Sequence, residues 1–298
     1  MAQYQNEMKK MAHGDDFTSD ESEIKPIIIS ETDSPVCEKK YRSVDSREFM
    51  MFYRTPPGEG AVAAIAFCHG GLGEAVPENL RSAVLNGALQ SRFLKKGYAI
   101  IQITRRAFGN ENGVPASPLV DLAIQDTVYA LNTIFSLEFV EKKSLAIYAG
   151  SGGGTMALGA AVETEPAALV LGEPASMILS GVFDALPTGK TFQELKNDLN
   201  KHYQSEQKEK LAAVVDQITA PTLLLQGDKS YISDFNHDHL VPVYQKKGKS
   251  IIEKVFPGQS HGFYWGRRGV DEALVDEIVE YVDEYLRERL NLKPRPIT

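Results

Sequence analysis

The sequence predicts an α/β fold in which helices cover both faces of a mostly parallel, doubly wound sheet. Six short apolar runs have the composition of strands that are buried on both faces. Longer segments with apolar residues at helical spacing lie between several of these runs. This alternation is typical of parallel sheets, because a crossover helix returns the chain to the same edge of the sheet.

The expected elements follow one another along the chain. Three β-rich stretches come first and predict an antiparallel edge: Lys25–Ser30, Val36–Arg42 and Arg47–Arg54. The six apolar runs are Ala61–Cys68, Tyr98–Thr104, Leu145–Ala149, Ala167–Leu171, Thr222–Leu225 and Ile251–Phe256. Helical spacing is clearest in Leu119–Phe135 and Glu272–Leu290, each of which carries one apolar stripe.

The predicted domain organisation is a polar N-terminal tail at residues 1–20 and one α/β domain at residues 21–298. Within the domain, residues 176–218 contain no strand and are too long for a simple crossover loop. Two runs in this segment have helical spacing, so we expect a helical insertion that caps a substrate pocket. The alternative role of this segment is packing or dimerisation. In the second case the protein would be a homodimer.

The composition is that of a globular protein and excludes several classes of partner. The chain has 298 residues, of which 43% are hydrophobic and 24% charged, and a net charge of −8. This acidic balance, without a long basic run, argues against nucleic acids and anionic membranes as partners. No stretch resembles a signal peptide or reaches the roughly 18 apolar residues that a transmembrane helix needs, so we expect a cytoplasmic protein. Two cysteines provide neither a disulfide framework nor a cysteine-rich metal site.

The strongest chemical signal is a serine in a glycine-rich turn. The apolar run that ends at Ala149 continues into residues 150–154 (GSGGG), and a stretch compatible with a helix follows. A sharp strand-to-helix turn exposes its serine and requires small neighbours, here Ala149 and Gly153. A phosphate-binding loop is the alternative, but the sequence has neither Gly-x-Gly-x-x-Gly spacing nor a Gly-Lys-Ser/Thr string at this place. Ser151 is therefore the predicted nucleophile.

A second glycine-rich turn, residues 67–73 (FCHGGLG), follows the first apolar run. Glycine turns leave backbone N–H groups unpaired, and such groups can stabilise a developing oxyanion. The expected donors are Gly71 and Leu72, together with Gly152, which follows the nucleophile. We expect His69 to be structural, because it lies where the loop must be held.

A histidine on the loop after the last apolar run is the predicted general base. His261 stands in residues 256–263 (FPGQSHGF), directly after that run. From this position an imidazole can reach the serine, accept its proton and later protonate the leaving group. None of the other five histidines follows a predicted strand at a comparable place, apart from the structural His69.

These three motifs resemble the α/β-hydrolase superfamily, particularly dienelactone-hydrolase-like esterases and the catalytic domains of prolyl-oligopeptidase-like enzymes. His-Gly-Gly, a Gly-x-Ser-x-Gly-like string and Ser-His-Gly-Phe occur in the family's order over roughly residues 45–290. Dienelactone hydrolases themselves use a cysteine where this sequence has Ser151. The resemblance implies an α/β-hydrolase fold and a serine hydrolase that uses no metal and no cofactor.

The acid of the expected triad is not where this family usually places it. The family's aspartate stands three residues after a glycine that ends the penultimate strand, and here Gly227 is followed at that place by Ser230. A hydroxyl cannot stabilise an imidazolium as a carboxylate does. Glu173 is the preferred replacement, because it keeps the order serine, acid, histidine and matches the position that pancreatic-type lipases use. Asp228 is the alternative acid, Asp234 is a further one, and a site without an acid also stays open.

Two arginines, Arg105 and Arg106, follow the second apolar run and also belong to the catalytic edge of the predicted sheet. They could bind an anionic substrate. Pairing with surface carboxylates is the alternative role.

The expected activity is hydrolysis of an ester-type acyl bond in a small molecule, as by a carboxylesterase, through an acyl-serine intermediate. A small peptidase or a thioesterase is an alternative with the same chemistry. The other alternative is a non-catalytic member of the fold that binds a ligand or signals. Ser230 favours that alternative, whereas the turn around Ser151 and the placement of His261 argue against it.

Overall fold

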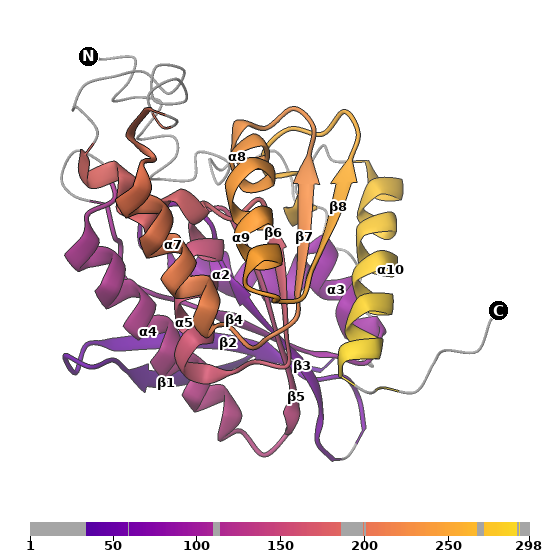
Figure 1. Ribbon diagram of the computed structural model, residues 1–298. Helices are drawn as coiled ribbons and strands as arrows, with labels where there is room; N and C mark the ends of the chain where they lie inside the picture. Colours follow the sequence, from indigo (N-terminus) through magenta and orange to yellow (C-terminus); the bar gives the residue numbers. More distant parts are fainter. Residues whose placement is uncertain are drawn as a thin grey trace, which may run out of the picture.

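Eight strands of the described residues form one sheet in the order β1-β2-β4-β3-β5-β6-β7-β8 (Figure 1). The computed structural model describes residues 34–58, 60–109, 114–185, 199, 201–266, 271–290 and 292. Strands β3 to β8 are parallel, while β1 and β2 form an antiparallel edge. The strands are β1 Cys37–Arg42, β2 Glu48–Arg54, β3 Val62–Cys68, β4 Ala99–Ile103, β5 Val140–Gly150, β6 Ala168–Gly172, β7 Thr222–Gly227 and β8 Ile251–Phe256.

Helices cover both faces of this sheet, as the sequence predicts. Helices α4, α5, α7 and α9 pack in a row on one face, and α3 and α10 pack together on the other (Figure 1). The helices are α2 Pro77–Asn86, α3 Ala88–Lys95, α4 Ser117–Phe135, α5 Gly152–Thr164, α7 Ser205–Gln217, α8 Tyr231–Phe235, α9 Val241–Lys246 and α10 Glu272–Arg289. Shorter turns are η2 Ser176–Ser180, η3 Val182–Ala185, η4 Asn236–Leu240 and η5 Phe263–Trp265. The predicted α/β-hydrolase fold class is confirmed.

The central strands supply residues to two hydrophobic cores. In β3, Ala64, Ala66 and Cys68 face the side of α4 and α5, whereas Ile65 and Phe67 face α3 and α10. All five side chains are buried. A strand with both faces covered must be apolar at every position, which is why these strands are continuous apolar runs in the sequence.

The predicted elements agree with the structure apart from their ends. The main difference is β5, which begins at Val140 instead of Leu145 and pairs with β3 across a register shift near Val62. Charged residues at 141–143 interrupt the apolar run there, so periodicity did not reveal the first half of the strand. The predicted strand Lys25–Ser30 and the tail at residues 1–20 lie outside the described residues.

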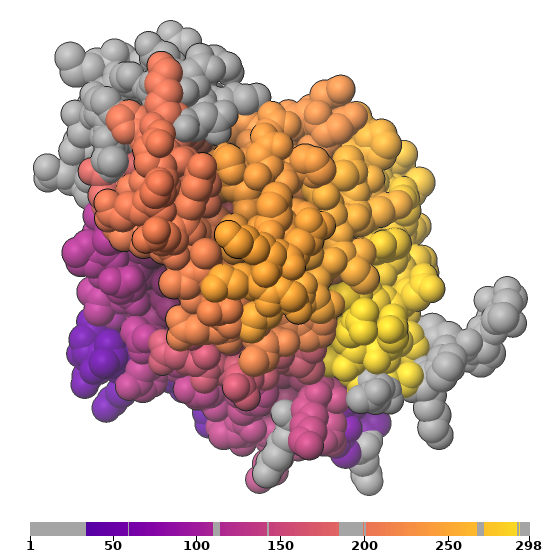
Figure 2. Space-filling view, in the orientation of Figure 1, coloured from indigo at the N-terminus to yellow at the C-terminus, as the bar shows by residue number. Residues whose placement is uncertain are grey.

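The segment predicted as a helical insertion contains η2, η3 and α7 in its described part. Leu211 and Val215 of α7 are buried in the core beside α5, so α7 is the crossover helix between β6 and β7. In the space-filling view, the segment from α7 to α9 forms the centre of this face, beside α10 (Figure 2). Residues 186–198 lie outside the described residues, and the cap therefore stays a prediction. No helix in the part of the chain that the structure describes is long and apolar enough to cross a membrane.

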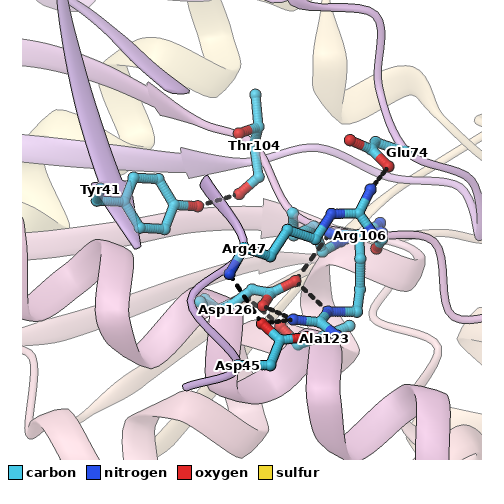
Figure 3. Close-up of polar contacts among 10 residues, drawn as sticks. Tyr41, Asp45, Arg47, Glu74, Thr104, Arg106, Ala123 and Asp126 are labelled. Carbon is cyan, nitrogen blue, oxygen red and sulfur yellow. Dashed lines mark hydrogen bonds and ion pairs between the residues drawn. The ribbon is translucent and has the colours of Figure 1, made fainter. Parts of the chain in front are cut away.

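A buried ion pair joins the loop after β4 to helix α4 (Figure 3). Arg106 donates from Nε and from Nη2 to the two carboxylate oxygens of Asp126, each at 2.8 Å. The Asp126 side chain is 0% exposed and the Arg106 side chain 8%. Asp45 pairs with the same guanidinium from the protein surface at 2.8 Å. Charges this deeply buried are tolerated because they are paired.

We predict that Arg106→Met lowers the free energy of unfolding by about 3 kcal/mol, because it leaves Asp126 as an unpaired buried carboxylate. The double variant Arg106→Met/Asp126→Leu should recover much of this loss, since no buried charge then remains. Urea-induced unfolding followed by circular dichroism measures both changes. A single variant that is as stable as the wild type contradicts the prediction.

Candidate active site

The register of the parallel strands brings several loops to one edge of the sheet. Cys68 in β3 pairs with Ala149 in β5, and Gly150 at the end of β5 pairs with Gly172 at the end of β6. The residues that follow these strands therefore emerge side by side at the carboxyl edge. The strand order reverses at β3, which lies between β4 and β5. Ligands of α/β proteins bind at such a point, at the carboxyl ends of the strands.

Ser151 occupies a sharp turn between β5 and α5, with φ 52° and ψ −127°. Its N–H donates to the carbonyl of Gly172 at 3.0 Å, which anchors the turn to β6. The turn also passes close to β3, so that a side chain at Gly153 would collide with the carbonyl oxygens of Cys68 and His69. This close approach is the physical reason for a glycine two residues after the serine.

Ser151, His261 and Glu173 form a hydrogen-bonded chain. His261 Nε2 lies 3.1 Å from Ser151 Oγ, and His261 Nδ1 lies 2.6 Å from Glu173 Oε2. With its Nδ1 proton directed at the carboxylate, the imidazole presents Nε2 to accept the serine proton. Such an arrangement can activate the serine as a nucleophile. Among the described residues, no three His, Cys, Asp or Glu side chains gather as a metal site would require.

Glu173 is fully buried at the end of β6 and is satisfied by hydrogen bonds. Its Oε1 accepts from the backbone N–H of Gly227 at 3.0 Å and from the hydroxyl of Ser233 at 2.9 Å. With the His261 contact to Oε2, three donors offset the loss of water around this carboxylate. Glu173 also has a positive φ of 41°. Two non-glycine residues at neighbouring strand ends, Ser151 and Glu173, thus hold strained backbone, which tends to cluster at functional sites.

The other acids considered from the sequence lie elsewhere. Asp228 accepts a hydrogen bond from the backbone N–H of Gly258 at 2.7 Å and so braces the turn after β8. Asp234 is exposed on α8. Ser230 is buried immediately before α8, and its hydroxyl has no hydrogen-bond partner among the described residues. Of these candidates, the structure brings Glu173 to the imidazole.

The turn after β3 lies directly beside Ser151. A β-carbon at Gly70 would lie 3.4 Å from the Ser151 β-carbon, and one at Gly152 would collide with the carbonyl oxygen of Gly71. In the described ranges, no acceptor contacts the N–H groups of Gly71, Leu72 or Gly152, the three donors predicted from the sequence. Unpaired N–H groups next to a nucleophile can stabilise a negatively charged oxygen.

The contacts of Arg105 differ from both roles that the sequence suggests for it. Its guanidinium donates to backbone carbonyls of the turn after β3, including those of His69 and Gly71. Arg105 is buried, and among the described residues its guanidinium donates only to backbone carbonyls, while Arg106 binds the carboxylates of Asp45 and Asp126. Burial, aided by the charge of Arg105, lowers the pKa of His69 to about 3. The imidazole of His69 is therefore neutral, as the structural role expected for it requires.

Tyr264 is a further residue at the site that the motifs did not indicate. Its hydroxyl lies 3.5 Å from His261 Nε2. Its ring lies so close to Gly150 and Gly172 that a side chain at either position would collide with it. Burial raises the pKa of this phenol, which therefore stays protonated at neutral pH. In the sequence, the trace of this packing is a glycine at the end of each of two adjacent strands, which does not by itself identify the ring.

Comparison with known protein families gives one relevant match. The model of the prolyl oligopeptidase family matches residues 120–289. This range runs from α4 to α10 and contains Ser151, Glu173 and His261. No curated protein matches the chain in a sequence comparison.

Many solved structures share the fold. A puromycin-hydrolyzing peptidase of Mycobacterium tuberculosis is 17% identical, with a TM-score of 0.64 over 89% of this chain and 40% of its own. Carboxyl esterase 2 of Tuber melanosporum is 15% identical, with a TM-score of 0.64 over 89% of both chains. An esterase of Thermogutta terrifontis is 20% identical, with a TM-score of 0.62 over 88% of this chain and 97% of its own. The chain thus spans about 40% of the length of the puromycin hydrolases that it resembles.

The contacts of the two acidic candidates lead to a direct prediction. Glu173→Gln should slow the reaction of Ser151 with a fluorophosphonate by about 10³- to 10⁴-fold, because the imidazolium that forms loses its carboxylate partner. Asp228→Asn is the matched control and should change the rate little, since Asp228 does not contact His261 and an asparagine oxygen can still accept from the Gly258 N–H. The inactivation rate constant, measured for every variant at the same pH, compares them. Equal rates for Glu173→Gln and the wild type would exclude Glu173 as the acid.

Proposed function

The chain belongs to the prolyl oligopeptidase family of serine hydrolases, and we propose that it cleaves a carboxylic ester through an acyl-serine intermediate. The observation that carries this proposal is the hydrogen-bonded chain of Ser151, His261 and Glu173, with atom separations of 3.1 and 2.6 Å. Its geometry supports nucleophilic catalysis by Ser151, with His261 as general base and Glu173 as the acid of the triad.

In the proposed first step, Ser151 Oγ attacks the carbonyl carbon of the ester while His261 Nε2 takes the hydroxyl proton. The carbonyl π bond opens, and its electron pair moves to the oxygen, which becomes the oxyanion of a tetrahedral intermediate. Glu173 stabilises the imidazolium through the Nδ1–H contact. The N–H groups of Gly71, Leu72 and Gly152 are the proposed donors to the oxyanion.

Collapse of this intermediate re-forms the carbonyl and breaks the bond to the alcohol, which leaves with the proton from His261 Nε2. The acyl group then remains on Ser151 as an ester. Water attacks that ester with the same imidazole as its base, and a second tetrahedral intermediate breaks down to the acid and free Ser151. The His261 side chain is 33% exposed, so the base is accessible to water for this second half of the cycle.

An ester is preferred over a peptide as substrate on the basis of the structural similarity. The two esterases align with this chain over most of their own length, whereas the puromycin hydrolases align over 40% of theirs. A peptide or amide substrate is the second candidate, favoured by the family match and by the puromycin hydrolases. A non-catalytic function is less well supported. Ser230 cannot supply a carboxylate to His261, but Glu173 contacts the imidazole instead.

We predict that the purified protein hydrolyses p-nitrophenyl esters of short acyl chains and that Ser151→Ala abolishes this turnover. A panel of acyl chain lengths gives the preferred acid, and matching p-nitroanilides test amide cleavage on the same acyl groups. Release of p-nitrophenol or p-nitroaniline measures both. Turnover of the anilides with none of the esters would reverse the preference for an ester, and turnover that survives in Ser151→Ala would exclude Ser151 as the nucleophile.

A further inference from the structure

Arg105 is a fully buried arginine that contacts the loop beside the nucleophile. Its side chain is 1% exposed. Nη2 donates to the carbonyl of Gly71 at 2.8 Å and to that of His69 at 3.3 Å, and Nη1 donates to that of Gly73 at 3.2 Å. The guanidinium thus binds three carbonyls of the turn that follows β3.

The hydrogen-bond partners of this guanidinium are unusual for a buried charge. Within the described residues, no carboxylate contacts the Arg105 guanidinium, and every hydrogen bond that it donates goes to a backbone carbonyl. Burial lowers its pKa to about 10, which still leaves the group charged at neutral pH. Asp126 and Glu74 act on this charge through space, without a hydrogen bond to it among the described residues, and a buried charge without a directly bonded partner is costly. A role at the adjacent site explains why the charge is present.

Peptide geometry connects these hydrogen bonds to the oxyanion donors. All peptide bonds in the described residues are trans, so the C=O of one residue and the N–H of the next point in opposite directions. The bond from Arg105 to the Gly71 carbonyl therefore fixes the direction of the Leu72 N–H, which points away from the guanidinium. Loss of that bond would free the Gly71–Leu72 peptide plane to rotate.

A second contact holds the same loop from the same side. The backbone N–H of Phe108 donates to the Leu72 carbonyl at 2.9 Å. The Phe108 ring lies 4.6 Å from the Arg105 guanidinium, measured to the ring centroid, and borders Gly152. The stretch after β4 thus fixes the peptide planes on both sides of Leu72. Of these two hydrogen bonds, the one from Phe108 comes from the backbone, so a side-chain substitution can remove only the one from Arg105.

We propose that Arg105 is a positioning residue that orients the Gly71–Leu72 peptide so that its N–H stabilises the oxyanion. The inference rests on the proposed function, because it assigns Arg105 a part in the same reaction. Arg105 does not touch the substrate. It acts through the backbone of the loop.

The test compares two adjacent buried arginines. Arg105→Met removes the contacts to the loop, and Arg106→Met, the matched control, removes a buried ion pair without touching the loop. Each variant is assayed at a temperature at which circular dichroism shows it to be folded. The measurements are kcat and KM on a p-nitrophenyl ester and the inhibition constant of a trifluoromethyl ketone with the same acyl side, whose hemiketal oxygen requires the oxyanion donors.

For Arg105→Met we expect kcat to fall by about 10- to 100-fold, less than the loss on deleting an oxyanion donor outright, while KM changes little. The inhibition constant of the ketone should rise by a similar factor, because ketone and transition state use the same donors. Arg106→Met should leave both quantities near their wild-type values despite its lower melting temperature. A folded Arg105→Met with wild-type kcat and ketone affinity overturns the proposal. So does a loss of kcat without a loss of ketone affinity.

Arg105→Lys serves if Arg105→Met does not fold. The ammonium keeps the charge but lacks the planar fork that reaches several carbonyls at once. We therefore expect kcat and ketone affinity to fall together, by less than the roughly 10- to 100-fold loss expected for Arg105→Met. Wild-type values in Arg105→Lys overturn the proposal. A wild-type protein that neither hydrolyses the ester nor binds the ketone overturns the proposed function and this inference together, whereas an active wild type with an unaffected Arg105 variant overturns this inference alone.

Discussion

The pairing of β5 with β6 at their carboxyl ends is the constraint on which the site depends. Gly150 pairs with Gly172, and the N–H of Ser151 continues the ladder by donating to the Gly172 carbonyl at 3.0 Å. Ser151 and Glu173 therefore leave neighbouring strands at the same level, each directly after a paired glycine. One imidazole can then reach both side chains, with Nε2 on the serine and Nδ1 on the carboxylate. A slip of one residue in this register would point one of the two side chains away from the other.

The two paired glycines also leave space for an aromatic ring beside the site. The ring of Tyr264 fills the space next to Gly150 and Gly172, where no other residue type leaves room for it. This ring follows His261 by three residues, so its burial also determines where the loop that carries His261 can lie. The hydroxyl of Tyr148, in β5, donates to the Tyr264 carbonyl and ties that loop to the sheet. Strand pairing, ring packing and the position of the imidazole are thus one connected arrangement.

Much of the fold and of the candidate site could be predicted from the sequence, because the residues concerned are close together in the chain. The strand, the turn and the helix around Ser151 are consecutive, and His261 follows the last strand directly, so short motifs reveal both. The contact of Glu173 with His261 was predictable because the sequence has Ser230 where a carboxylate is expected, and Glu173 follows a neighbouring strand. Arg105 and Tyr264 could not be assigned, because their partners are backbone carbonyls and glycines more than thirty residues away in sequence, which leave no motif. The early start of β5 was missed for a different reason, since charged residues break its apolar run.

The position of Glu173 at the end of β6 determines what the loop after β7 must provide. In the hydrolases that this sequence resembles, that loop carries the carboxylate, and here it carries donors to a carboxylate on β6. Gly227 donates through its backbone and Ser233 through its hydroxyl, both to Glu173 Oε1. Because both oxygens of a fully buried carboxylate need donors, Glu173 at the end of β6 depends on this loop for the two hydrogen bonds to Oε1.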